Sequence, residues 1–160
     1  MSDRQHAFLR KQLVDAMQGH QAHIDFDSAI GDFPAELRGV KIPGAPHTAW
    51  QLLEHMRIAQ WDILEFSRNP KHESPKWPEG YWPKTEAPPD AKAWDASVRA
   101  FQKDARALED LVSDAKQDLF RPFEHGEGQT LLREALLIAN HNSYHLGQLV
   151  YLKKALVKQG

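Results

Sequence analysis

The chain has 160 residues, of which nine are histidine and none is cysteine, and its formal net charge is −2. This length suits one folded unit with its own core, so we expect a single domain over residues 1–160. The charge does not favour nucleic-acid binding, and the lack of cysteine excludes disulfides, thiolate metal sites and cysteine nucleophiles. The start, MSDRQHAFLRKQ, has no apolar signal segment, and no stretch has the about 20 apolar residues of a membrane span. We therefore expect a cytoplasmic protein that does not bind membranes.

The first long helix begins at Ser2, because Ser2 and Gln5 have the spacing of a capping box. Its apolar residues continue with helical spacing towards Gly19, where we expect it to end. The next segment, residues 24–39, is predicted to hold short helical turns, and KIPGAP at residues 41–46 is predicted to be a loop.

A second capping box, Thr48 with Gln51, predicts that another long helix starts there and ends before Pro70. From Pro70 to Pro89 the chain is rich in proline and tryptophan and can be neither regular helix nor central strand. A third long helix is expected from Asp90 to about Leu119.

The fourth long helix is expected from Thr130 to Lys158, and alternating strand patterns are nearly absent. Four long amphipathic helices with one long loop, between the second and the third, predict an all-α fold. The arrangement that we expect is an antiparallel four-helix bundle.

Most of the nine histidines need no functional explanation. Six lie in polar stretches or beside helix ends: His6, His20, His23, His47, His72 and His125. We expect His6, His72 and His125 to be solvated. His20 and His23 flank the end of the first helix, where a cation favours the helix dipole.

Two further histidines, His141 and His145, are four residues apart, so that a helix places them one turn apart on one face. That face combines polar and apolar side chains: Glu134, Ile138, His141, His145, Gln148, Leu149 and Leu152. Polar groups that face a core need partners. Two imidazoles and an amide on this face indicate a ligand held between helices.

His55 lies in the apolar stretch LLEHM of the second long helix. A single buried histidine can simply donate to a nearby carbonyl. Alternatively, three imidazoles from two helices can bind one ion, because helix bundles build metal sites from facing helices. Spacing alone leaves both accounts open. The residue after His141 is Asn142 rather than glutamate, so the metalloprotease motif with its own general base is absent.

The stretches WQLLEHMRIAQWDIL and HNSYHLGQLVYLKKAL, separated by a long variable connection, resemble the DinB/YfiT-like superfamily. The resemblance covers most of the chain. It implies that His55, His141 and His145 bind a divalent metal inside a four-helix bundle, and that the protein is a homodimer. Sequence does not identify the ion, since imidazoles suit zinc, nickel, iron or copper, and manganese is a further candidate. Gln148 is expected to bond a water at the site or a backbone group.

Two accounts remain open for Gly147, which either packs against a neighbouring helix or lets a ligand approach closely. Two accounts also remain for Trp77, Tyr81 and Trp82. They form either a lid over the metal or a small core at the end of the bundle, and we favour the core.

The resemblance suggests two chemistries, transfer of a low-molecular-weight thiol to an electrophile and hydrolysis of a small molecule. Thiol transfer is preferred because no carboxylate base is evident. Glu54, Asp62 and Glu134 are the nearest candidates for proton transfer, and the catalytic residues stay unassigned. The alternatives are a non-catalytic protein that holds a metal and a hydrophobic ligand, and a structural bundle without metal.

Overall fold

The computed structural model describes residues 2–19 and 21–157, and these residues form helices, turns and loops without any strand. The long helices are α1 (Asp3–Gln18), α3 (Ala49–Arg68), α4 (Ala93–Ser113) and α5 (Leu131–Val157). The short elements are α2 (Phe26–Ile30) and two 3-10 turns, η1 (Ala35–Leu37) and η2 (Glu79–Tyr81). The predicted all-α class is therefore confirmed. In these residues no helix is long and apolar enough to cross a membrane.

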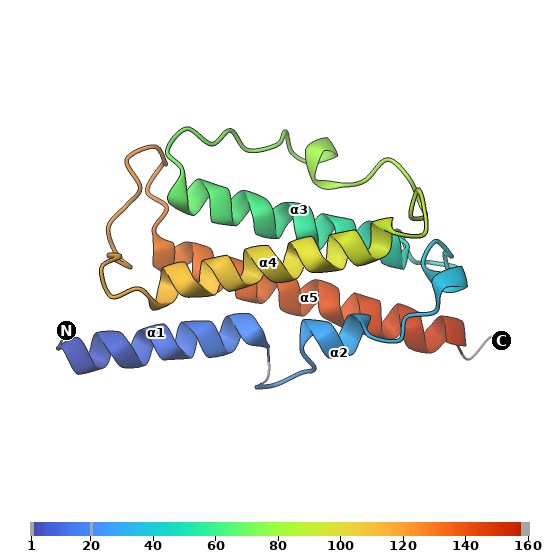
Figure 1. Ribbon diagram of the computed structural model, residues 1–160, viewed down its shortest axis with the longest axis horizontal. Coiled ribbons are helices and arrows are strands. Elements are labelled where there is room, and N and C mark those ends of the chain that lie inside the picture. The colour runs from blue at the N-terminus through green and yellow to red at the C-terminus, as the bar shows by residue number, and fades with distance from the viewer. Residues whose placement is uncertain (1, 20, 158–160) are drawn as a thin grey trace.

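The four long helices lie side by side, with α3 against α4 and α5, and α1 against the same two helices. Figure 1 shows that α1 and α5 run in one direction and that α3 and α4 run in the other. Residues 69–92 return along the outside of α3 to the start of α4. An antiparallel arrangement of all neighbours is thus not confirmed, because the long connection lets α3 and α4 run parallel.

The two predicted capping boxes are present. The Ser2 hydroxyl accepts from the backbone N–H of Gln5, whose side chain accepts from the backbone N–H of Ser2. Thr48 and Gln51 make the same pair of bonds at the start of α3. Each such cap stabilises a helix start by about 1 kcal/mol. Gly19 ends α1 in the left-handed conformation, with φ of 77°, which glycine adopts without strain.

The expected end of α4 near Leu119 is wrong, because the helix ends at Ser113. Asp114 is extended, and its carboxylate accepts from the backbone N–H of Lys116 at 2.9 Å, which forms a local turn. Leu119 is nevertheless buried, so the apolar residue that suggested more helix packs into the core from a loop.

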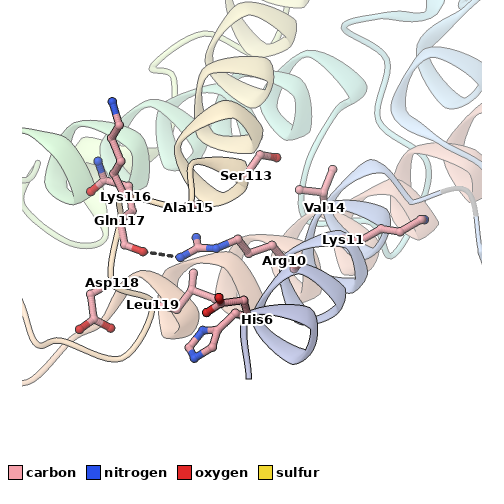
Figure 2. Close-up of a pocket in the computed structure, with 12 residues that line it drawn as sticks. His6, Arg10, Lys11, Val14, Ser113, Ala115, Lys116, Gln117, Asp118 and Leu119 are labelled. Carbon is pink, nitrogen blue, oxygen red and sulfur yellow. Dashed lines mark hydrogen bonds between the residues drawn. The ribbon is translucent and has the colours of Figure 1, made fainter. Parts of the chain in front are cut away.

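Arg10 of α1 caps the C-terminal end of α4. Its guanidinium donates to the carbonyl of Val112 at 2.6 Å and to the carbonyl of Gln117. Figure 2 shows Arg10 extending from α1 towards Gln117 along the wall of a pocket between α1 and the segment after α4. The buried arginine thus satisfies the Val112 carbonyl, which the end of α4 leaves without an intrahelical partner, and the Gln117 carbonyl in the segment that follows.

The apolar core consists of two clusters with polar side chains between them along α3 and α5. One cluster includes Leu52, Leu53 and Leu149, and the other includes Leu64 and Ile138. The buried polar side chains between these positions are His55, Gln60, Asp62, Asn142 and His145. Since a buried polar group is costly without a partner, this layer is where a ligand or a hydrogen-bond network is expected.

Candidate metal site

His55 of α3 and the α5 pair His141 and His145 meet in the polar layer. The Nε2 atoms of His55 and His141 are 2.9 Å apart, and the three ring centroids are 4.6–4.8 Å from one another. One ring nitrogen from each histidine lies within 4.8 Å of the other two. The predicted residues are therefore brought together, and α5 supplies two of them because its period places residues 141 and 145 on one face.

The hydrogen bonds of two rings fix which nitrogen carries the proton. The Nδ1 of His55 lies 2.9 Å from the backbone oxygen of Tyr81, and the Nδ1 of His145 lies 2.7 Å from Oε1 of Gln148. Each oxygen can only accept, so Nδ1 donates and Nε2 carries the lone pair, which in His55 faces Nε2 of His141 at 2.9 Å. The carbonyl account of His55 is confirmed, and the metal account is compatible with it, because the carbonyl bond turns the other nitrogen towards the α5 pair.

Burial keeps the cluster uncharged near neutral pH. Desolvation, opposed by the Tyr81 carbonyl and aided by His145 and His47, lowers the pKa of His55 from the ordinary 6.5 to about 4. Desolvation and the other two imidazoles also lower the pKa of His141 to about 4. Burial lowers the pKa of His145 as well. Neutral imidazole is the form that ligates metals.

The donor set fits a divalent transition-metal ion. Two nitrogens bound at about 2.1 Å and at right angles to each other would be about 3 Å apart, which the 2.9 Å between His55 and His141 matches. The third nitrogen lies within 4.8 Å of the other two. Three nitrogen donors leave coordination positions open, as in catalytic sites. The identity of the ion is not determined by these ligands.

Aromatic rings of residues 77–82 lie against this cluster. Trp82 stacks on His55 at 3.9 Å and 3°, and its other face stacks on His47 at 3.8 Å and 17°. Trp82 also packs against the apolar core. Trp77 is 66 % exposed, with its ring centroid 6.4 Å from that of His55. The favoured core account therefore fits Trp82, whereas for Trp77 both accounts stay open.

Two histidines lie in places that the sequence did not suggest. His72 is not solvated as expected, because its Nε2 bonds the buried Asp62 at 2.7 Å and its side chain is only 7 % exposed. His47 sits on Trp82, and burial followed by Lys41 lowers its pKa. The signal available for His47 was its position directly before the Thr48 cap of α3, the helix that carries His55.

The three carboxylates considered for proton transfer all have other partners. Glu54 bonds Arg57 at 2.7 and 2.9 Å and accepts from Ser97 at 2.5 Å. Asp62 accepts from Tyr81 as well as from His72, and Glu134 pairs with Arg133 at 2.7 Å. Among the described residues, no carboxylate belongs to the three-histidine cluster.

A pocket of about 440 Å³ adjoins the cluster between α5 and residues 42–47. Gln148 and His47 line it and connect it to His145 and, through Trp82, to His55. Gly147 also lines it, and apart from the backbone of its own helix no atom lies within 4 Å of where its Cβ would be. The helix-packing account of Gly147 is therefore wrong, and its open side faces the pocket.

The fold is all-helical, and the three neutral imidazoles that converge in it form a candidate metal site. A family model described as the DinB superfamily matches residues 18–149, and the chain belongs to this superfamily. The match includes all of α3 and the part of α5 that carries His141 and His145. Comparisons with curated proteins and with solved structures found no match.

Proposed function

We propose that this protein is a divalent-metal-dependent enzyme that transfers a low-molecular-weight thiol to a small electrophile. The observation that carries the proposal is the cluster of three neutral imidazoles without a carboxylate beside them. We also propose a four-helix bundle of the DinB/YfiT-like type as its core. The single domain, the homodimer and the cytoplasmic location expected from the sequence stay predictions.

The three histidines would hold the ion through their ring nitrogens, and the partners of Nδ1 hold two of the rings in place. The Tyr81 carbonyl orients His55, and Gln148 orients His145. Such outer partners tune metal affinity about 10–100-fold in known sites. When bound, a divalent ion supplies positive charge that lowers the pKa of a thiol or of water. Trp82 covers one face of His55 and keeps solvent from it.

The lack of a free base favours a thiol over water as nucleophile. A free thiol has a pKa of about 8.5, whereas the pKa of bulk water is far higher. A thiol therefore ionises near pH 7 with a much smaller shift and without a protein base. The thiolate sulfur then bonds to the electrophilic carbon as the bond from that carbon to its leaving group breaks. The leaving group takes the bonding electron pair, and the thiol proton goes to solvent. The engaged carboxylates of Glu54, Asp62 and Glu134 are consistent with this requirement.

The pocket beside the cluster supports a small-molecule substrate with an apolar part. Its volume of about 440 Å³ lies in the range of ligand pockets. Its walls are mainly apolar or aromatic: Ile42, Pro43, Ala45, Leu52, Tyr144 and Tyr151. Gln148 and His47 are the polar groups that a substrate would meet on the side of the cluster.

Turnover tests the proposal. Untagged protein is loaded separately with zinc, nickel, iron or manganese and incubated with a panel of electrophiles, with and without several low-molecular-weight thiols. Mass spectrometry should detect a thioether product that depends on the thiol, the metal and His145. His125→Ala, which removes an exposed histidine outside the cluster, is the control and should keep activity. Hydrolysis without a thiol, or ligand binding without turnover, would contradict thiol transfer.

A further inference from the structure

Asp62 is a buried carboxylate on α3, two helical turns beyond His55. Its Oδ1 accepts from Nε2 of His72 at 2.7 Å, and its Oδ2 accepts from the hydroxyl of Tyr81 at 2.5 Å. Both oxygens are therefore engaged by one segment of the connection between α3 and α4. Burial and the Asp62 carboxylate raise the pKa of the Tyr81 phenol, so this hydroxyl remains a donor.

This carboxylate holds both ends of residues 72–81 at one point. Among the described residues, three hydrogen bonds join residues 70–84 to α3, two of them to Asp62 and the third from His55 to the Tyr81 carbonyl. The closed loop between the two ends carries the exposed Trp77. Without Asp62, the nearest other hydrogen bond from α3 to this connection would be the one that Nε1 of Trp50 donates to Oγ1 of Thr85 at 3.0 Å, four residues past Tyr81.

Tyr81 links Asp62 to the candidate metal site because its hydroxyl bonds Asp62 and its backbone carbonyl bonds His55. The hydroxyl is fixed to Asp62, while the backbone oxygen accepts from Nδ1 of His55 at 2.9 Å. The next residue, Trp82, lies flat on the His55 ring. The position of residues 81 and 82 therefore determines both the tautomer and the plane of this imidazole.

We propose that Asp62 is a positioning residue that, through Tyr81, fixes His55 with its proton on Nδ1 and its Nε2 towards His141 and His145. The inference rests on the proposed function only in taking that cluster as a metal site. Direct proton transfer by Asp62 is a poorer account. Asp62 lies two turns, or about 10 Å along the helix, from His55, and both of its oxygens already accept hydrogen bonds.

Two conservative variants test this inference. Tyr81→Phe keeps the ring and the backbone carbonyl and removes only the hydroxyl, and Asp62→Asn keeps the shape of the carboxylate and removes its charge. Tyr151→Phe, which removes the hydroxyl of a tyrosine that is 68 % exposed, is the matched control. Circular dichroism and thermal unfolding of each variant establish that helix content is retained.

The first readout uses metal-free protein and nitrogen-15 NMR of the imidazoles near pH 7. Wild type and Tyr151→Phe should show His55 with its proton on Nδ1, and the two test variants should show a mixture of tautomers. The second readout is the Kd for Zn²⁺ by chelator competition, which should rise about 10–100-fold in the test variants alone.

Folded test variants with the wild-type tautomer and the wild-type Kd would overturn the inference. If Asp62→Asn does not fold, Tyr81→Phe decides the question alone. If the tautomer changes as expected but wild type does not bind Zn²⁺, the proposed function fails while the positioning by Asp62 stands. Equal weakening in Tyr151→Phe would also overturn the inference, because the effect would then not be specific to the Asp62 contact.

Discussion

Replacing His145 by alanine should remove metal binding without unfolding the protein. The side chain is 7 % exposed, donates to Gln148 and contacts the other two rings of the cluster. Loss of the hydrogen bond costs about 1 kcal/mol, and loss of packing costs about 1–2 kcal/mol. The metal-free variant should therefore be less stable by about 2–3 kcal/mol, since both apolar clusters remain.

The stabilisation of the folded protein by bound metal can be measured separately. At a free metal concentration of 100 times Kd, wild type should gain about 2.7 kcal/mol, which corresponds to about 5–10 °C in Tm. The variant should gain nothing. Thermal unfolding of both proteins with and without Zn²⁺ measures the four values, and His125→Ala controls for ions bound by exposed histidines.

The reasoning fails on either of two results. An increment in His145→Ala equal to that of wild type would show that the ion binds elsewhere. An unfolded metal-free variant, or an unfolded metal-free wild type, would show that metal holds the helices together. The site would then be structural, and the enzymatic proposal would lose its main support.

Three further predictions follow from burial and hydrogen bonding. The pKa values of about 4 for His55 and His141 mean that the unfolded chain binds more protons between pH 6.5 and 4. Stability of the metal-free protein should thus fall as pH falls through this window, and a Tm unchanged from pH 7 to 4 would contradict the burial. Arg10→Met should lower the free energy of unfolding, measured in urea, by about 2–4 kcal/mol, because two carbonyls lose their donor. A loss below about 0.5 kcal/mol, which is the scatter of surface substitutions, would refute this role of Arg10. Gly147→Ala should stabilise α5 by about 0.5–1 kcal/mol, because the added Cβ meets open space. The same variant should raise KM if the substrate binds in the pocket that Gly147 lines. An unchanged KM would show that the substrate does not bind there.

Helix starts were predictable because their signals are local. Each capping box needs only two residues three apart, and both boxes are found where the sequence places them. The end of α4 was not predictable in this way. It depends on Arg10, which lies about a hundred residues away in sequence, and on a turn at Asp114 within a segment whose apolar residues still suggested helix.

The candidate site divides along the same line. The helical period predicts that His141 and His145 share a face. His55 was assigned to the same site because of its apolar setting and the family resemblance. The buried state of His72 depends on Asp62, and the stack of His47 on Trp82 depends on the path of a proline-rich segment. Neither contact follows from spacing, because irregular segments have no period that would place their side chains.

The metal content of untagged protein tests the central claim most directly. After loading and removal of free ions, elemental analysis of wild type and of His125→Ala should find about one divalent ion per chain. His55→Ala and His145→Ala, folded by circular dichroism, should contain almost none. Wild type that retains no ion, or cluster variants that retain as much as wild type, would contradict metal binding by His55, His141 and His145.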